Sequence, residues 1–361
     1  MKIKTLLCFS AILTTLSCTE TQNSQDLLNL KKALQPVPKQ AILQDSSYFI
    51  WGASPIKDDR GNYHLYYSRW KKEYGFSAWV THSEIAHAVS RDLFGPYEFK
   101  DIALPERGES FWDGHTTHNP TIHKWNGKYY LYYMGNRGDR KRTENELNWT
   151  HRNNQRIGVA VSSSPNGPWK RFDTPLIDVS PDTTASDALA VCNPSVIQRP
   201  DGKFLMVYKA IAQKMPLPFG GPVVHLTAVS DSPLGPFKKN MTPVFSTEDS
   251  FFAAEDPYIW YQNKRYYAIV KDMKGKFTHK GQSLALFTSS DGEDWKVAAH
   301  TLVSELVLNW EGNRRDTIDR LERPQLYIED GIPQALFVAV SSKNQKNHTY
   351  NVSIPLNFHS K

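Results

Sequence analysis

The chain of 361 residues contains little cysteine, and this limits the chemistry open to it. Two of its three cysteines, Cys8 and Cys18, lie in an N-terminal segment typical of a targeting signal. Only Cys192 is left in the body of the chain, so no internal disulfide is expected there. Because Cys192 follows the apolar run 188–191, we expect a buried, unreactive thiol rather than a nucleophile.

Long hydrophobic runs and metal or phosphate motifs are missing as well. Beyond the N-terminus, no stretch reaches the roughly 18 apolar residues of a membrane-spanning helix. No zinc-ligand spacing, phosphate-binding loop or nucleic-acid motif is present, and the net charge of +6 is moderate. We therefore expect a monomer with no nucleic-acid partner and no cofactor, with a structural calcium ion as an open alternative.

The N-terminal segment predicts a lipid anchor. Lys2 and Lys4 precede the apolar run 6–13, and the sequence TLSC at 15–18 resembles a bacterial lipoprotein cleavage site. We expect a signal peptide over 1–17, a lipidated Cys18 and a flexible tether over 18–40. The product would be an outer-membrane lipoprotein of the cell envelope, periplasmic or surface-exposed, tethered rather than embedded.

A repeat organises the rest of the chain. Five times, a residue followed by proline opens a short apolar strand, a turn such as Asn126-Gly127 follows, and a second strand comes next. Asn-Gly and Asp-Gly supply the positive φ angles that tight hairpins need. The five openings are Ser54-Pro55, Asn119-Pro120, Asn193-Pro194, Asp256-Pro257 and Arg323-Pro324.

Units of about 65 residues with three or four antiparallel strands are blades, and five blades close into a propeller. We therefore predict an all-β fold, a single five-bladed β-propeller catalytic domain over residues 41–361. The fifth unit ends without the glycine turn and aromatic residue that close the other four. Residues 41–50 are the candidate to complete its outer edge.

The repeat also predicts the site. Proline cannot donate to a strand ladder and is tolerated at the first position of a strand. In a propeller, the innermost strands begin around one central funnel, so we expect the residues before the prolines to share one pocket; the alternative is that some only cap strand ends. The expected set is Ser54, Asn119, Asn193, Asp256 and Arg323, with Glu255 and Glu322 beside them.

Strands such as KYYLYY at 128–133 and turns such as SSSPNGPW at 162–169 resemble the propellers of family-43 glycoside hydrolases over residues 45–355. The resemblance implies an aspartate base before the first-blade proline, a third-blade aspartate that tunes pKa and a fourth-blade glutamate acid. This chain has Ser54, Asn193 and the pair Glu255-Asp256 there. Losing a general base costs about 10²–10⁴-fold in rate, so ordinary family-43 hydrolysis is disfavoured unless Asp113 substitutes.

The predicted pocket is rich in nitrogen and poor in paired acids, which suits an anionic sugar. We expect His118 to act as base or acid, with His115 or a tyrosine as its partner, and Glu255 or Asp256 to orient a histidine or bind a hydroxyl. Trp51, Trp79, Trp112 and Trp260 are candidates to stack on sugar rings, at most two of them in the pocket. The expected ligands of the sugar are Arg323, Asn119 and Asn193 as a carboxylate clamp, with Ser54, Arg69, Lys209, Glu322 and Trp112.

The leading hypothesis is β-elimination at a terminal uronic acid, by a dehydratase that expels water or a lyase that expels a neighbouring sugar. The whole pattern also resembles family-43-like lipoproteins of marine Bacteroidetes that act on acidic algal polysaccharides such as ulvan. Two alternatives stay open. One is an exo-acting glycoside hydrolase of family-43 or family-117 type with relocated carboxylates such as Asp113 with Glu255, and the other is a catalytically silent glycan-binding lipoprotein.

Overall fold

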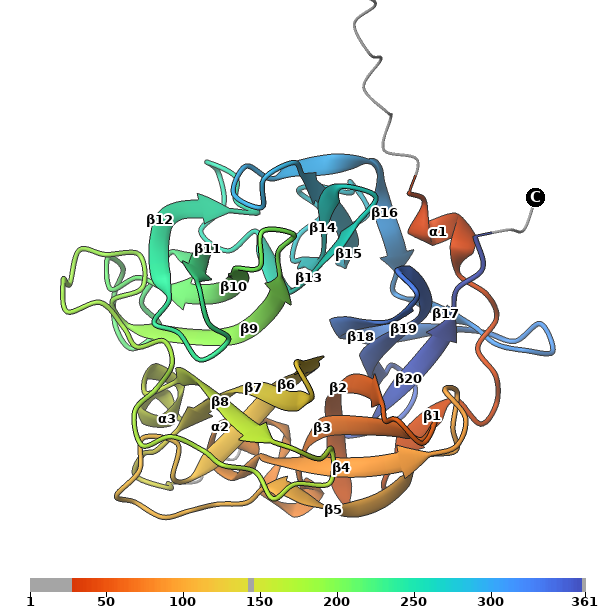
Figure 1. Cartoon of the computed structure of the whole chain (residues 1–361), viewed down its shortest axis with the longest axis horizontal. Helices are drawn as coiled ribbons and strands as arrows, with labels where there is room; N and C mark the ends of the chain where they lie inside the picture. The colour runs from red at the N-terminus through yellow and green to blue at the C-terminus, as the bar shows by residue number, and fades with distance from the viewer. Residues whose placement is uncertain (1–27, 142–145, 359–361) are drawn as a thin grey trace, which may run out of the picture.

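The computed structural model describes residues 28–141 and 146–358, and nearly all of its regular structure is β-strand. Antiparallel sheets stand around one central axis as the five blades of a propeller (Figure 1), which confirms the predicted fold. Blade 1 contains β2–β5, blade 2 β6–β8, blade 3 β9–β12 and blade 4 β13–β16. Blade 5 contains β18, β19 and β20, flanked by β17 and β1.

The strands are short, as the turn-rich sequence predicts. Blades 1 and 2 are built from β2 (Tyr48–Lys57), β3 (Tyr63–Lys71), β4 (Glu84–Ser90), β5 (Glu98–Leu104), β6 (Thr116–Trp125), β7 (Lys128–Asn136) and β8 (Arg156–Ser162). Blades 3 and 4 are built from β9 (Ala190–Gln198), β10 (Phe204–Ile211), β11 (Val223–Ser230), β12 (Lys238–Val244), β13 (Ala254–Gln262), β14 (Arg265–Asp272), β15 (Ser283–Ser289) and β16 (Lys296–Glu305). Blade 5 is built from β1 (Ile42–Gln44), β17 (Val307–Asn309), β18 (Arg315–Glu329), β19 (Ile332–Ser342) and β20 (Thr349–Pro355).

Helices are few and short in the described part of the chain, and all of them lie outside the sheets. They are α1 (Leu30–Ala33), α2 (Trp79–His82), α3 (Trp149–Asn153) and the 3₁₀ turns η1 (Lys72–Tyr74) and η2 (Phe76–Ala78). Within these residues no helix is long and apolar enough to cross a bilayer.

The chain closes the ring with its own N-terminal strand. β1 pairs antiparallel with β20, with Ile42 opposite Val352, so residues 41–50 contribute the missing edge of blade 5 as predicted. The predicted tether over 18–40 is wrong in its second part, because Leu30 and Val37 are buried against blades 4 and 5. Their apolar side chains favour packing over solvation. Cys18, the predicted signal and residues 18–27 lie outside the described residues.

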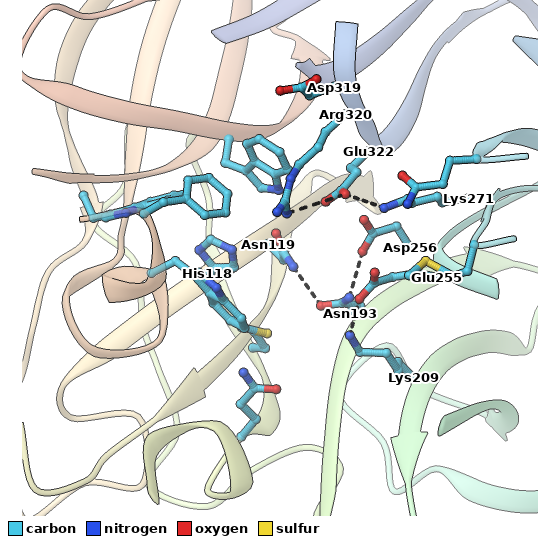
Figure 2. Close-up of a pocket in the computed structure, with 18 residues that line it drawn as sticks. His118, Asn119, Asn193, Lys209, Glu255, Asp256, Lys271, Asp319, Arg320 and Glu322 are labelled. Atoms are coloured by element: carbon cyan, nitrogen blue, oxygen red, sulfur yellow. Dashed lines mark hydrogen bonds and ion pairs between the residues drawn. The ribbon is translucent and has the colours of Figure 1, made fainter. Parts of the chain in front are cut away.

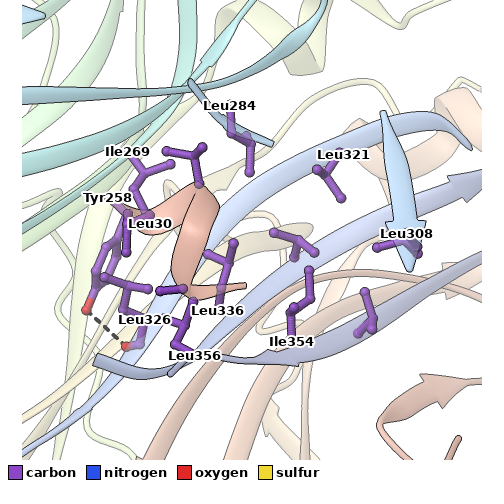
Figure 3. Packing of buried hydrophobic residues seen from close by; sticks show 14 of the residues in the cluster. Leu30, Tyr258, Ile269, Leu284, Leu308, Leu321, Leu326, Leu336, Ile354 and Leu356 are labelled. Atoms are coloured by element: carbon purple, nitrogen blue, oxygen red, sulfur yellow. Dashed lines mark hydrogen bonds between the residues drawn. The ribbon is translucent and has the colours of Figure 1, made fainter. Parts of the chain in front are cut away.

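Apolar side chains pack between neighbouring blades rather than along the axis. Separate buried clusters fill all five interfaces, and the largest joins blades 4 and 5. Figure 3 shows that interface, where Leu30 of α1 meets Leu284 of β15 and Leu336 of β19. Cys192 is also buried, as expected, and burial raises the pKa of its thiol. The axis itself is left to polar groups, and these form the site.

Candidate active site

A cavity of about 350 Å³ opens at the end of the propeller where the innermost strands begin. One wall is aromatic and belongs to blade 1, and the opposite wall carries charged side chains of blades 3, 4 and 5 (Figure 2). His118, Asn119 and Asn193 lie between the walls, and Met134, Gln155, Met273 and Gln282 complete the lining. The aromatic wall consists of Trp51, Trp70, Phe76 and Trp79, and the charged wall of Lys209, Glu255, Asp256, Lys271, Asp319, Arg320 and Glu322.

Each innermost strand carries a bulge at the level of the pocket. In β6, β9, β13 and β18 the bulge holds the predicted residue and its proline, and the pairing register shifts across it. The residue before proline has a positive φ of 52–54° in all four strands. Asparagine and aspartate tolerate this left-handed conformation, whereas it is unusual for arginine. The four bulge residues are Asn119, Asn193, Asp256 and Arg323.

The first blade departs from the predicted alignment. Its bulge lies between Trp51 and Ser54, and the residue with positive φ there is Gly52, at 55°. Ser54 is two residues further on, so the expectation that it lies at the shared axial position is wrong. Its hydroxyl donates to Gln325 Oε1 at 3.2 Å and lines a groove at the opposite end of the propeller. Gly52 followed by alanine breaks the residue-proline pattern, which is why the repeat pointed to Ser54.

Hydrogen bonds join the four axial residues across the blades. Asn119 Nδ2 donates to Asn193 Oδ1 at 2.8 Å, and Asn193 Nδ2 donates to Asp256 Oδ1 at 2.8 Å. The backbone N–H of Arg323 donates to Asp256 Oδ2 at 3.2 Å, and Arg323 Nη2 donates to the carbonyl of Asn119 at 3.3 Å. Gly52 has no side chain to add, and a Cβ there would stand 3.2 Å from Arg323 Cγ. The side chain of Arg323 therefore takes the space that the first blade leaves open.

Arg323 consequently does not reach the pocket. It is 1% exposed and absent from the cavity lining, so its predicted role as a carboxylate clamp is wrong. The cations that do line the cavity are Lys209, Lys271 and Arg320. Lys271 was missed although it occupies the same repeat position as Lys209, directly opposite the residue before the bulge.

The prediction that Arg69 reaches the pocket is also wrong, because it chose a strand position one residue too far along β3. Ser68, not Arg69, faces Trp51 across the first hairpin, and a shift of one residue turns a strand side chain to the other face. Arg69 instead donates to Glu84 at 2.9 Å, and its guanidinium stacks 4.3 Å from the rings of Tyr48 and Phe99. It takes no part in the pocket.

Two ion pairs stand on the charged wall. Lys209 Nζ lies 2.5 Å from Glu255 Oε1, and Lys271 Nζ lies 2.5 Å from Glu322 Oε1. Burial alone would raise the pKa of Glu255, but the ammonium groups of Lys209 and Lys271 outweigh it and bring the pKa to about 2. Burial and the charge of Glu255 raise the pKa of Asp256 to about 6. Glu255 therefore stays ionised at neutral pH, whereas Asp256 can bind a proton near neutrality.

Four acidic side chains line the pocket, so the expectation of a pocket poor in paired acids is wrong. Asp319 and Glu322 come from β18, and Glu255 and Asp256 come from β13. The residue before each proline and the residue preceding it were recognisable from the repeat, whereas Asp319 and Arg320 lie further up an unusually long strand.

His118 is the histidine that the structure brings into the pocket. Its Nδ1 is bound by Ser83 Oγ at 2.7 Å, which leaves Nε2 as the nitrogen available to a substrate. The ring stacks 5.0 Å from Trp79. Burial, and then the positive charges of Arg323 and Lys209, hold the pKa of His118 well below 6.5. The imidazole is therefore neutral at physiological pH, the state that a proton acceptor needs.

Three other predicted residues lie outside the cavity. His115 accepts from the backbone N–H of Gly138 at 3.1 Å and does not line the pocket. Trp112 donates to the carbonyl of Phe172 at 3.1 Å and lines a separate crevice. Asp113 is fully buried in an ion pair, 2.5 Å from Arg107 Nη2, so it cannot substitute as a base in the pocket. All three directly precede β6 in sequence, but their side chains make their contacts outside the cavity.

The prediction for the four candidate tryptophans is confirmed, but it was incomplete. Trp51 and Trp79 line the pocket and Trp112 and Trp260 do not, so two of the four candidates are placed there as expected. Trp70 and Phe76 were missed. Trp70 lies at the end of β3, and Phe76 lies in the loop that follows. The repeat predicts no residue of these two segments at the axis.

No metal site is evident in the described ranges 28–141 and 146–358. No group of three or more histidine, cysteine, aspartate or glutamate side chains in these ranges could hold a metal ion.

A family model described as glycosyl hydrolases family 43 matches residues 85–267, just over half of the chain. The chain belongs to glycosyl hydrolase family 43. No curated protein sequence matches this family-43 member. Solved structures extend the likeness to the whole propeller.

Three solved structures illustrate the shared fold. The family 117 glycoside hydrolase Zg3597 of the marine bacterium Zobellia galactanivorans is 18% identical, with a TM-score of 0.59 over 86% of each chain. An endo-arabinase of Bacteroides thetaiotaomicron is 13% identical, with a TM-score of 0.54 over 90% of this chain and 98% of that chain. The GH62 alpha-L-arabinofuranosidase catalytic domain of Coprinopsis cinerea is 12% identical, with a TM-score of 0.58 over 91% and 98%. At such identities the likeness shows the propeller fold alone.

Proposed function

We propose that this family-43 member eliminates a group from the terminal uronate of an acidic oligosaccharide, with His118 as the base. The proposal depends on two differences between this pocket and the one that the family-43 resemblance implies. The resemblance to family 43 implies an aspartate base in blade 1, and Gly52 stands at that axial position. A neutral imidazole, oriented by Ser83, faces the cavity from blade 2 instead.

The charge distribution supports proton abstraction next to a carboxylate. Removing the C5 proton of a uronate creates an anionic enolate, which must be stabilised by cations. Lys209, Lys271 and Arg320 line the cavity, and the charge of Lys209 contributes to the low pKa of His118. The charge of Lys209, which adds to the effect of burial on His118, would also favour the anion formed when His118 takes the proton.

The proposed reaction balances within the pocket. His118 Nε2 accepts the C5 proton, the electron pair forms a C4–C5 double bond, and the bond from C4 to its oxygen breaks. The departing oxygen takes a proton from the imidazolium or from Asp256, whose pKa of about 6 leaves it partly protonated near neutrality. Water leaves in a dehydratase and a shortened sugar chain in a lyase. A pocket of this size at one end of the propeller axis favours the chain end, and so the dehydratase.

Glycoside hydrolysis is the second candidate, because the chain belongs to a hydrolase family and four carboxylates line its pocket. Hydrolysis needs an acid to protonate the leaving oxygen and a carboxylate to activate water. Asp256, with its raised pKa, and Glu255 or Glu322 would fill these roles in place of Asp113. Glycan binding without turnover is the third possibility, in which the aromatic wall serves recognition alone.

Incubation with sulfated and unsulfated uronate oligosaccharides separates the three. Elimination produces an ultraviolet-absorbing double bond, and a dehydratase product is lighter than its substrate by one water. Hydrolysis produces new reducing ends without that absorbance, and products that together are heavier by one water. Binding without turnover would leave the oligosaccharide mass unchanged. Reducing ends without absorbance would overturn the elimination proposal.

We also propose that the protein is a monomer held in the outer membrane by lipid on Cys18. The support is the signal-like sequence ahead of it. Cys18→Ser should abolish labelling by a palmitate analogue and move the protein from the membrane fraction to the soluble fraction. Retention in the membrane without label would contradict the anchor.

A further inference from the structure

A shelf of aromatic side chains lies near the pocket, built from the exposed Phe219 and Phe251 and the half-buried Trp149. Four of the nine exposed large apolar side chains in the described part of the chain lie in two of the three segments that carry it, which marks the area as a patch rather than scatter. They are Met215, Leu217, Phe219 and Phe251, with exposed fractions of 37%, 56%, 36% and 46%.

The shelf is a continuous surface made by blades 2, 3 and 4. The ring of Phe219 lies 5.9 Å from that of Trp149 and 6.2 Å from that of Phe251, with edge-to-face geometry in both pairs. Trp149 belongs to α3, Phe219 to the loop between β10 and β11, and Phe251 to the loop between β12 and β13. Three loops distant in sequence thus present their aromatic rings side by side.

Polar contacts hold the shelf in place. Arg152 is buried, donates to the carbonyl of Phe219 at 2.7 Å, and lies 5.6 Å from the ring of Trp149. Asn153 Nδ2 donates to the carbonyl of Pro218 at 3.0 Å. The 212–222 loop is also closed on itself, because Lys214 N donates to the carbonyl of Gly221 at 3.1 Å. Such anchoring lowers the entropy lost when a ligand binds.

Two contacts between a lysine ammonium and an aromatic ring place the shelf beside the pocket. The ammonium of Lys209, on the charged wall, lies 5.7 Å from the ring of Phe252, the neighbour of Phe251. Met273 lines the pocket, and the ammonium of the next residue, Lys274, lies 5.5 Å from the ring of Phe251. A ligand whose end occupies the pocket would therefore extend over aromatic rings bordered by cations.

From this continuity we propose that the shelf binds the sugar units of an anionic oligosaccharide beyond the unit held in the pocket, and so sets the preferred chain length. Aromatic rings pack against the apolar faces of sugars, and Lys274 offers a cation to their acidic groups. The inference rests on the proposed action on acidic oligosaccharides. It adds a binding surface outside the cavity and depends on neither elimination nor hydrolysis.

The test compares chain lengths. Wild type, Phe219→Ala, Phe251→Ala and the double variant are assayed with di-, tetra- and hexasaccharides of alternating uronic acid and neutral sugar. Each truncated ring removes one contact with the sugar chain, so the double variant should lose about 10-fold in kcat/KM on the hexasaccharide, through KM, and keep wild-type values on the disaccharide. Ile332→Ala, an exposed apolar truncation at the first residue of β19, is the matched control.

The possible outcomes are distinct. Equal losses at every chain length, or no loss at any, would overturn the shelf as a subsite. A wild-type dimer that the double variant dissociates, with unchanged chain-length dependence, would assign the patch to a second copy of the chain and overturn the proposal. Calorimetric titration with the hexasaccharide tests binding by the shelf independently of the reaction. Weaker binding by the double variant would support the shelf as a subsite even if no turnover occurs.

Discussion

The two ends of the propeller axis are lined by the same five strands and have opposite chemistry. At the end where the strands begin, the pocket carries Lys209, Lys271 and four carboxylates. The groove at the other end, of about 540 Å³, is lined by isoleucine, tyrosine, tryptophan and amide side chains, with Lys124 as its one charged residue. The strands are alike, so the difference comes from the bulges. A bulge re-aims side chains and lets polar groups point into the axis at one level only.

The largest expected effect is on catalysis at the pocket end. His118→Ala should lower kcat by about 10²–10⁴-fold, because the base is removed. Ser83→Ala, which removes only the hydrogen bond to Nδ1, should cost less. The pKa of His118 lies well below 6.5, so wild-type activity should persist as pH falls below 6.5 and decline only at more acidic pH. Turnover of His118→Ala within a few-fold of wild type would remove His118 from the mechanism.

The next effect is on stability at the same end. Lys209→Met leaves Glu255 buried without its cation and should lower the free energy of unfolding by about 3 kcal/mol. Adding Glu255→Gln should recover most of the loss. At the opposite end, Lys57→Met breaks the exposed pair with Glu329 and should have little effect. Urea denaturation measures the stability of all three variants. Equal losses for Lys209→Met and Lys57→Met would contradict the expected difference between the two ends of the propeller.

Acid should destabilise the fold through buried histidines. Burial brings the pKa of His123, in the opposite groove, to about 4 and that of His225 to about 3. As pH falls below 6.5 the unfolded chain binds protons at these positions and the folded chain does not. The free energy of unfolding should therefore decrease, by up to about 1.4 kcal/mol per pH unit for each histidine. Urea midpoints across pH should show a shallower slope for His225→Phe than for the wild type.

A smaller effect is expected at the first-blade bulge. Gly52→Ala places a Cβ at φ 55°, 3.2 Å from Arg323 Cγ, and should cost about 1–2 kcal/mol of stability. Gly61→Ala has a positive φ with open space around it, so it isolates the conformational cost. Equal losses of stability in Gly52→Ala and Gly61→Ala would show that the packing of the Arg323 side chain does not depend on the space beside Gly52.

The smallest effect is expected at Ser54. Ser54→Ala removes hydrogen bonds to Gln325 and to the backbone N–H of Ile122, which should cost about 1 kcal/mol of stability and leave turnover unchanged. Ser68→Ala, in the same hairpin at the pocket end, removes the acceptor for the N–H of Asn119 and should also lower turnover. Turnover lost in Ser54→Ala would return that residue to the site.

The repeat in the sequence predicted the propeller, its closure by residues 41–50 and the convergence of Asn119, Asn193 and Asp256, because blade geometry is set by short-range turns and strand pairing. Gly52 was missed because its bulge lacks proline, and Arg323 was misplaced because its side chain bends into space left by another blade. Trp70, Phe76 and Arg320 reach the pocket from a loop and from strand extensions. Their positions depend on packing between blades that are distant in sequence, and no local pattern encodes that packing.

The pairing of β1 with β20 has a consequence for how the protein is made. Residues 42–44 are translated long before their partners at 350–352. Until blade 5 forms, β1 has no partner and its strand edges are open to other chains. Ring closure therefore needs both ends of the propeller sequence, and chains shortened before residue 350 would retain an open seam prone to self-association.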